Sequence, residues 1–169
     1  ILTTISFAMA FGLLPAQERV GSFMVYKNVP ELAGKRITAV CQSKYGYLWI
    51  GTSDGLVRFD GRRYVTFHAS GSSITDNQVS HLLEDDSGRL WIAGKLHGLS
   101  RYDPRTGTFT RWPAIWSETA QFQRVHKIAE SADGDIWLAT GAGMARYDAG
   151  ANTFRLYQAP GKAPVIDLV

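Results

Sequence analysis

Two acidic groups are the first side chains of this sequence whose types could hold a metal ion or transfer a proton. They are Glu84-Asp85-Asp86 and Asp133-Gly134-Asp135, and neighbouring carboxylates serve elsewhere as calcium ligands or as an acid–base pair. Both groups coincide with a predicted tight turn, where Asp and Gly are favoured for backbone reasons. A turn is therefore our interpretation of each group, and a metal site is the alternative.

The histidines do not share one position of any pattern: they are His68, His81, His97 and His126. His81 and His126 fall in predicted inner strands, where neighbouring repeats would bring them near each other. The sequence contains no G-x-S-x-G, H-E-x-x-H, C-x-x-C or phosphate-binding loop motif. We therefore expect no catalytic residue, no metal and no cofactor in this segment.

Four residues are candidates for binding a ligand: Lys95, His97, Trp116 and Arg124. The first two lie in the lengthened turn 94–98, and the other two in the long connection 113–124. An aromatic ring beside a basic group can stack on and hydrogen-bond a sugar or an anion. All four depart from an internal repeat, and a binding site must break the symmetry of a repeat. For Trp116 the alternative is a hydrophobic anchor that holds its loop.

The repeat itself is centred on Trp49, Trp91 and Trp137, which are 42 and 46 residues apart. Two columns of glycine accompany these tryptophans, one before and one after them: Gly46, Gly88 and Gly134, then Gly55, Gly98 and Gly143. An arginine column and an aspartate column follow: Arg58, Arg101 and Arg146, then Asp60, Asp103 and Asp148. Coincidence of so many columns identifies a true internal repeat.

Each copy parses into four short strands joined by turns that contain glycine. Four-stranded antiparallel units with this period are typical of β-propeller blades, although a solenoid is an alternative. The sequence thus predicts an all-β partial propeller with blades at about 37–67, 79–112 and 125–157, and a fourth that begins near residue 165. Phe23–Tyr26 shows the aromatic spacing of an outer strand. One Trp per blade at the same place favours packing between blades over ligand stacking.

The N-terminal segment differs in kind from the repeats. Residues 1–17 are apolar without charge until Glu18, which is typical of the core and cleavage region of a secretory signal peptide whose start is missing; a buried helix is the alternative. The remainder, 18–169, is the propeller region. Its net charge of +3 is spread along the chain, so we expect no nucleic acid partner. The single cysteine, Cys41, excludes an internal disulfide.

The pattern Val-x-x-Leu-x-Glu-Asp-x-x-Gly-x-Leu-Trp-Ile resembles the two-component regulator propeller repeat. The second copy carries it best, through Glu84-Asp85, Gly88, Leu90-Trp91-Ile92, Gly98-Leu99 and Arg101-Tyr102-Asp103. The third copy departs from it at Ser131 and Met144. The resemblance implies the opening part of a periplasmic or extracellular ligand-sensing propeller, the outer part of an inner-membrane protein with a histidine kinase or diguanylate cyclase output.

The leading functional hypothesis is therefore a sensor region without catalysis of its own. Expected partners are a small ligand such as a carbohydrate, the remaining blades, a downstream signalling domain and, in the full-length protein, a second copy of the chain. One alternative is a propeller enzyme resembling streptogramin lyase, which would need a His/Glu pair and a metal ion on the central face. Another is a scaffold for protein interactions.

Overall fold

The computed structural model of the chain describes residues 5–7, 19–20, 23–26, 29–71, 73–96, 98–112, 124–141 and 143–157. The chain divides into two units, Ile1–Gly34 and Lys35–Val169. The first unit holds β1 (Ile5–Phe7), β2 (Arg19–Val20) and β3 (Phe23–Tyr26) in an antiparallel sheet of order β1-β3-β2, followed by the short 3-10 helix η1 (Pro30–Leu32). Phe23–Tyr26 is thus a strand, and it is the middle strand of its sheet. The predicted signal segment falls largely outside the described residues.

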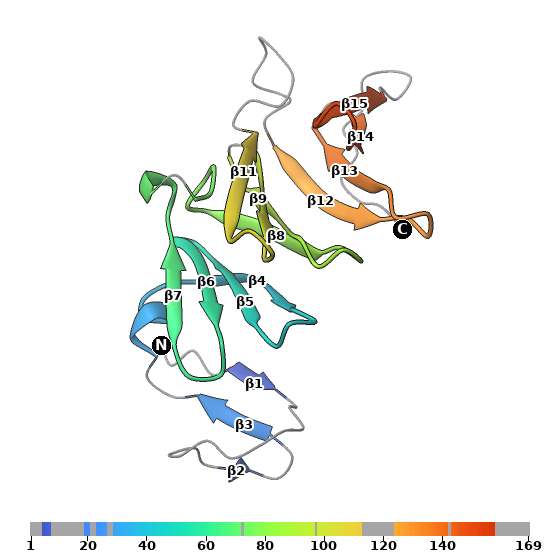
Figure 1. The fold of residues 1–169 in the computed structure, drawn as a ribbon. Coiled ribbons are helices and arrows are strands. Elements are labelled where there is room, and N and C mark those ends of the chain that lie inside the picture. Colours follow the sequence, from blue (N-terminus) through green and yellow to red (C-terminus); the bar gives the residue numbers. More distant parts are fainter. Residues whose placement is uncertain are drawn as a thin grey trace. The chain divides into compact units, whose positions relative to one another are not determined.

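The second unit consists of three four-stranded antiparallel sheets, which are propeller blades (Figure 1). Blade 1 contains β4 (Ile37–Gln42), β5 (Leu48–Thr52), β6 (Gly55–Phe59) and β7 (Tyr64–Phe67). Blade 2 contains β8 (Val79–Glu84), β9 (Leu90–Gly94), β10 (Leu99–Asp103) and β11 (Thr108–Trp112). Blade 3 contains β12 (Val125–Glu130), β13 (Ile136–Thr140), β14 (Gly143–Asp148) and β15 (Thr153–Tyr157). The 3-10 turn η2 (Ala69–Gly71) follows blade 1. The all-β partial propeller predicted from the sequence is confirmed.

The repeated glycines and aspartates shape the turns inside each blade. Gly46, Gly88 and Gly134 have φ angles of +84°, +79° and +80°, a conformation in which a Cβ atom is strained. The aspartate column closes the turn between the third and fourth strands, since its carboxylates accept backbone N–H bonds: Asp60 from Arg62 and Arg63, Asp103 from Arg105, and Asp148 from Gly150 and Ala151. Two columns of the repeat are therefore explained by local backbone geometry.

A β-bulge recurs at the second residue of every inner strand. The pairing register shifts between Ile37 and Ala39, between Val79 and His81, and between Val125 and Lys127. The bulged residues are Thr38, Ser80 and His126. The Thr38 hydroxyl donates to the carbonyl of Val79 in the next blade, at 2.6 Å. The bulge thus bends each inner strand at its start, beside the neighbouring blade.

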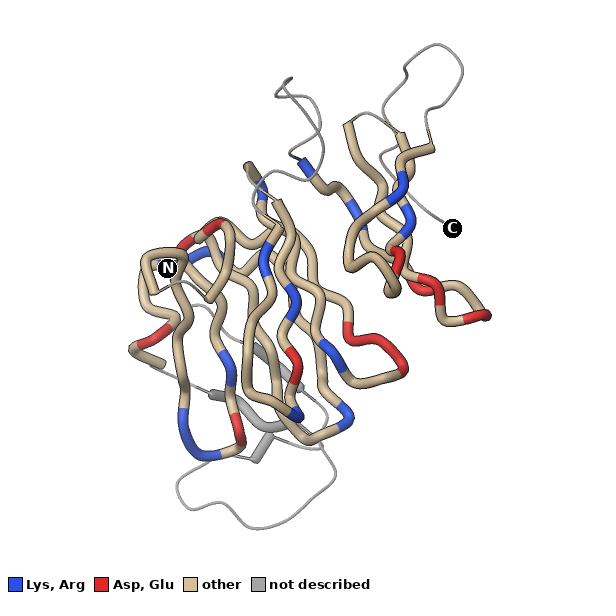
Figure 2. The backbone as a smooth tube through the Cα atoms, turned by 45° about the horizontal axis from the view of Figure 1, so that its top comes forward, with Lys and Arg blue, Asp and Glu red and all other residues tan. Residues whose placement is uncertain are grey.

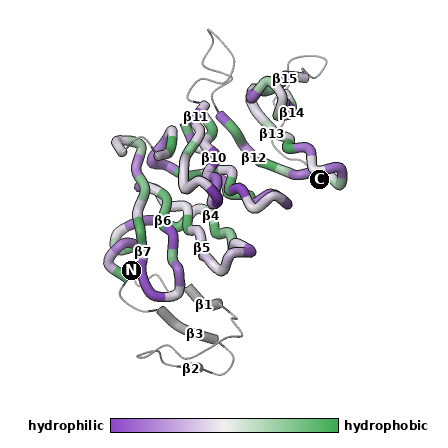
Figure 3. Tube along the Cα trace, viewed as in Figure 1, coloured by the Kyte–Doolittle hydropathy of each residue, from purple (hydrophilic) through white to green (hydrophobic). Residues whose placement is uncertain are grey.

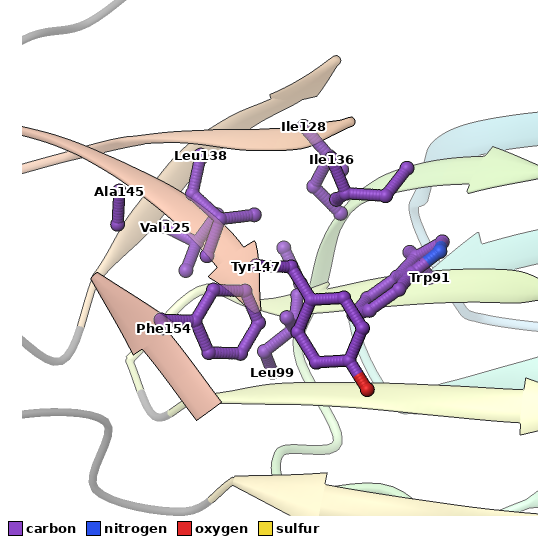
Figure 4. Packing of buried hydrophobic residues seen from close by; sticks show 10 residues of the cluster. Trp91, Leu99, Val125, Ile128, Ile136, Leu138, Ala145, Tyr147 and Phe154 are labelled. Atoms are coloured by element: carbon purple, nitrogen blue, oxygen red, sulfur yellow. The ribbon is translucent and has the colours of Figure 1, made fainter. Parts of the chain in front are cut away.

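The hydrophobic cores lie between blades, and we call these interfaces seam 1 (blades 1 and 2) and seam 2 (blades 2 and 3). Trp49 is 1% exposed in seam 1 and Trp91 is 0% exposed in seam 2. Close to Trp91, seam 2 gathers Leu99 of blade 2 with Leu138, Tyr147 and Phe154 of blade 3, among others (Figure 4). The apolar residues follow the strands of each blade rather than a single central layer (Figure 3). Trp137 of blade 3 is only partly buried.

Each seam is also closed by an arginine from the third strand of the preceding blade. The Arg58 guanidinium lies 4.8 Å from the ring centroid of Tyr47, and its Nη1 donates to the Tyr102 hydroxyl at 3.3 Å. The Arg101 guanidinium lies 5.3 Å from the Trp91 centroid, and its Nη1 donates to the Tyr147 hydroxyl at 2.8 Å. The Nε atoms of both arginines are buried without a hydrogen-bond partner within the described part of the chain. Aromatic rings compensate this desolvation through cation–π attraction.

Candidate ligand-binding face

Antiparallel pairing gives the blades two ends with different loops. The inner strands begin, and the second and third strands are joined, at one end, which we call the entry face. The first and second strands, and the third and fourth, are joined at the other end, which we call the hairpin face. Lys95 follows β9 and Arg124 precedes β12, so the two described ligand candidates both lie on the entry face. His97 and Trp116 lie outside the described residues.

Charge is distributed unequally between the two faces. Within the described part of the blades, every Asp and Glu except Asp54 and Asp76 lies at the hairpin face, at a strand end or in a turn (Figure 2). The acidic groups singled out in the sequence belong to this set and occupy the first hairpin turns of blades 2 and 3. The described residues contain no group of three or more His, Cys, Asp and Glu that could hold a metal ion.

The two carboxylates of the entry face are already engaged. Asp54 lies 3.7 Å from the Lys35 ammonium and 3.9 Å from Nδ1 of His68. Asp76 accepts the backbone N–H of Gln78 at 2.9 Å and that of Leu96 at 2.7 Å. Asp54 is therefore paired with basic groups, whereas Asp76 is held by backbone N–H groups of the turns on either side of it.

Basic side chains on the entry face for which no ion pair appears among the described residues include Arg36, Lys95 and Arg124. The backbone holds Arg36 and Lys95 in similar places, because in blades 1 and 2 the turn after the second strand donates a hydrogen bond to the residue before the inner strand. Ser53 N–H donates to the Arg36 carbonyl at 2.9 Å, and Lys95 N–H donates to the Gln78 carbonyl at 2.7 Å. Each blade thus contributes a cation beside the start of its inner strand.

Arg36 was not selected by the sequence analysis. Its signal was available, since Arg36 and Arg124 both stand one residue before an inner strand, at Ile37 and at Val125. In the folded blades Arg36 lies on the same face as Lys95, because Arg36 precedes an inner strand and Lys95 follows a second strand.

The electrostatics of this face also act on His126. Burial is the main cause that lowers the pKa of the His126 imidazole, and the nearby Arg124 charge adds to the effect. His126 is therefore a neutral hydrogen-bonding group at neutral pH. His81, which stands one repeat position later on β8, is not its structural equivalent, because His126 occupies the bulge and His81 pairs with Ala93.

A hollow lies at the hairpin face, between the ends of β4 and β8. It has a volume of about 720 Å³ and is lined by Cys41, Lys44 and Glu84 among others. Its charged side chains bond to the backbone: the Glu84 carboxylate accepts the backbone N–H of Lys44 at 2.9 Å, and the Lys44 ammonium donates to the backbone carbonyl of Asp86. Burial raises the pKa of the Cys41 thiol, so this thiol is a poor nucleophile.

The Asp85 carboxylate lies deeper, in the interior of blade 2. Its carboxylate accepts the indole N–H of Trp91 at 2.8 Å and the Nε–H of Arg89 at 2.8 Å. In blade 3 the equivalent Ser131 accepts the Asp135 N–H instead, at 3.2 Å. The carboxylate of Asp85 is therefore structural, and the carboxylates of Glu84 and Asp86, which also line the hairpin hollow, disfavour an anionic ligand there. The entry face is the stronger candidate.

Three stacked units of four antiparallel strands, with tryptophans buried between them, define a β-propeller. The family described as "Two component regulator propeller" matches residues 31–54 and 73–95. Two stretches of the chain, in blades 1 and 2, are therefore similar to the repeat of this family. No curated protein sequence matches the chain significantly.

Solved structures show the same fold. The extracellular domain of the putative hybrid two component system BT3049 from B. thetaiotaomicron is 24% identical, with a TM-score of 0.66, over 87% of this chain and 22% of its own. The corresponding domain of BT4673, a putative one component system from the same organism, is 16% identical with a TM-score of 0.67, over 86% and 20%. A catalytically inactive virginiamycin B lyase from Staphylococcus aureus is 13% identical with a TM-score of 0.63, over 96% and 47%.

The chain spans about a fifth of the length of the two-component system domains and about half of the lyase. At these identities the likeness is one of fold. Among the described residues no helix is long and apolar enough to cross a membrane.

Proposed function

We propose that the blades are part of an extracytoplasmic ligand-sensing propeller, which binds an anionic or sugar ligand on its entry face and passes this signal to another part of the protein. The observation that carries the proposal is the set of basic side chains Arg36, Lys95 and Arg124, which have no ion pair within the described part of the chain and lie on the face with the fewer carboxylates. The similarity of two stretches to the family's repeat and the extracellular two-component neighbours support the sensor role.

Lys95 and Arg124 are the described members of the proposed site, with His97 and Trp116 as further members from the sequence analysis. A guanidinium offers fork-like bonds to carboxylate or sulfate groups, and an indole offers a flat surface to a sugar ring. The neutral His126 imidazole adds a donor and an acceptor beside Arg124. The site requires recognition and no bond cleavage, so the proposal assigns no catalysis to this part of the chain. The remaining blades, a downstream signalling domain and a second copy of the chain are its proposed partners.

The test compares two double variants that remove the same charge from opposite faces. Lys95→Ala with Arg124→Ala removes two cations from the entry face, and Arg62→Ala with Arg63→Ala removes two from an exposed hairpin turn. A glycan array of neutral and acidic saccharides, followed by calorimetry on any bound member, supplies the ligand. We expect at least tenfold weaker binding for the entry-face variant and unchanged binding for the control. Equal affinity of both variants, or binding of no saccharide by the wild type, would contradict the proposal.

A further inference from the structure

The turn between the second and third strands is built differently in blade 2 than in blades 1 and 3. In blade 1 the buried Thr52 hydroxyl closes this turn by donating to the Gly55 carbonyl at 2.8 Å. In blade 3 the buried Thr140 hydroxyl donates to the Gly143 carbonyl at the same distance of 2.8 Å. Blade 2 has Gly94 in place of the threonine, and its turn is one residue longer. The lengthened turn must therefore be held in another way.

Hydrogen bonds to the connection that precedes blade 2 hold this turn. The Lys95 N–H donates to the Gln78 carbonyl at 2.7 Å, and the Leu96 N–H donates to the Asp76 carboxylate, also at 2.7 Å. The same carboxylate accepts the Gln78 N–H at 2.9 Å, so Asp76 ties the turn to the connection. The backbone of Lys95 and Leu96 is thus fixed by bonds from two successive N–H groups.

Leu96 is a large apolar side chain that this anchored turn leaves in water. It is 51% exposed, although turn positions favour small or polar residues, and the equivalent turns carry Ser53-Asp54 in blade 1 and Gly141-Ala142 in blade 3. Blade 2 has a neighbouring blade on each side (Figure 1), so this exposure does not come from an open end of the array. A single exposed leucine is common on proteins, but this one lies on the candidate ligand-binding face beside one of its cations.

Lys95 supplies the charge next to this apolar side chain. It is partly buried, and no ion pair of its ammonium appears among the described residues. A lysine carries its point charge on a hydrocarbon stem, which adds further apolar surface. Adjacent positions of one anchored turn thus offer a positive charge and an apolar surface. A uniformly polar ligand would use the charge and leave Leu96 in water.

We infer that Lys95 and Leu96 together recognise a ligand that joins an anionic group to an apolar one, such as an acidic sugar with an aryl or acyl substituent. The inference rests on the proposed function, because it narrows the ligand expected on the entry face. Binding brings the anion to the Lys95 ammonium and removes the Leu96 side chain from water, and the second contribution grows with the apolar area of the substituent. Leu96 is accordingly a specificity-determining residue, whereas Lys95 serves acidic ligands with and without the substituent.

The test uses the whole chain and three probes: D-glucuronate, which has only the acid, phenyl β-D-glucoside, which has only the aryl group, and phenyl β-D-glucuronide, which has both. Calorimetry or ligand-observed NMR titration measures the Kd of each probe. We expect the phenyl glucuronide to bind about tenfold more tightly than either of the other two. Leu96→Ser should reduce its affinity to that of glucuronate and leave the affinity for glucuronate unchanged, whereas Leu96→Met should keep the preference.

Val65→Ser is the matched control, because Val65 is 39% exposed on the outer strand of blade 1, and it should change none of these affinities. Similar affinities for glucuronate and phenyl glucuronide, including no detectable binding of either, would overturn the inference. A preference for the phenyl glucuronide that survives Leu96→Ser would overturn it as well. Lys95→Ala separates this failure from a failure of the proposed function. If Lys95→Ala weakens the binding of both acids while Leu96→Ser has no effect, only the inference is wrong. If both acids bind and Lys95→Ala with Arg124→Ala leaves their affinities unchanged, the entry-face site itself is wrong.

Discussion

Seam 1 and seam 2 are built on one plan but strengthened differently. In seam 1 the aromatic contact next to the arginine pairs Trp49 with Phe67, whose ring centroids are 5.9 Å apart with 40° between the planes. In seam 2 it pairs Trp91 with Trp112, stacked at 5.8 Å with 15° between the planes. The arginine-to-tyrosine bond is also shorter in seam 2, at 2.8 Å against 3.3 Å. We call each of these arginines, with the tyrosine and the aromatic rings around it, an arginine clasp: Arg58 with Tyr102 in seam 1 and Arg101 with Tyr147 in seam 2. The clasp of seam 2 is therefore the tighter of the two.

Asn152 explains part of this difference. It lies in the left-handed region with φ of +51°, which Asn adopts more readily than other side-chain-bearing residues. Its Oδ1 accepts the Tyr147 hydroxyl at 2.8 Å, and its carbonyl accepts the Trp112 indole N–H at 3.2 Å. A turn residue of blade 3 thus fixes both the tyrosine and the second tryptophan.

The turn contacts show the opposite trend. In seam 1 the Glu84 carboxylate lies beside the cationic Lys44 turn. In seam 2 the Glu130 carboxylate lies beside Asp86 and Asp85; burial, together with these like charges, raises its pKa. The arginine clasp is tighter in seam 2, whereas the turn contact is more favourable in seam 1. The two contacts can therefore be tested separately.

The largest effect should come from removing the tryptophan at the centre of the tighter clasp. Trp91→Ala should lower the free energy of unfolding by about 3–5 kcal/mol, because it leaves a cavity between blades and removes the indole N–H that the buried Asp85 carboxylate accepts. Trp137→Ala, on the partly exposed face of blade 3, should cost about 1 kcal/mol. Denaturant titration of both variants measures the difference. Equal losses would show that burial in a seam is not what Trp91 contributes.

A smaller effect should separate the two tyrosine hydroxyls. Tyr147→Phe should cost about 1–2 kcal/mol because it removes bonds to both Arg101 and Asn152, whereas Tyr102→Phe removes a longer bond to Arg58 and should cost about 0.5 kcal/mol. The ring packing is kept in both variants, so chemical denaturation compares hydroxyls alone. A larger loss for Tyr102→Phe would reverse the order of the clasps.

The strands could be predicted from the sequence because their signals are local. The first inner-strand residues, Ile37, Val79 and Val125, were placed correctly from the repeat, since glycine turns and the tryptophan column fix the period. The seam contacts could not be predicted, because Arg58 meets a tyrosine 44 residues away and one sequence does not show which blade faces align.

The candidate site was predictable only in part for a similar reason. Lys95 and Arg124 were found as departures from the repeat. Arg36 was missed because its place on the entry face, away from most of the carboxylates, follows only from the three-dimensional arrangement of the strands. The roles of His97 and Trp116 remain predictions from the sequence.

The pH dependence of seam 2 should reveal His126 as a weaker contributor. Its folded-state pKa is lowered, chiefly by burial and then by Arg124, so the unfolded chain binds the proton more tightly. Stability should therefore fall as the pH drops through the ordinary histidine pKa of about 6.5. His126→Gln should flatten this part of the profile of unfolding free energy between about pH 7 and pH 5. A variant with an unchanged profile would assign the dependence to another group.

The smallest effect, and the sharpest contrast, should come from the two turn glutamates. Glu84→Gln weakens a charged acceptor beside a lysine and should cost about 0.5 kcal/mol at neutral pH. Glu130→Gln keeps an amide oxygen for the Asp86 N–H and removes a carboxylate from beside two others, so the variant should be as stable as the wild type or slightly more so.

The pH dependence of this stability difference follows from proton linkage. Because the folded-state pKa of Glu130 is raised, its stabilising contribution is complete below the ordinary glutamate pKa and is lost as the pH rises through the folded value. The advantage of Glu130→Gln over the wild type should accordingly grow from acidic to neutral pH and then stay constant. Thermal or denaturant unfolding at several pH values measures both variants. If Glu130→Gln became less stable than the wild type as the pH rises, the Glu130 carboxylate would be favourable in the seam.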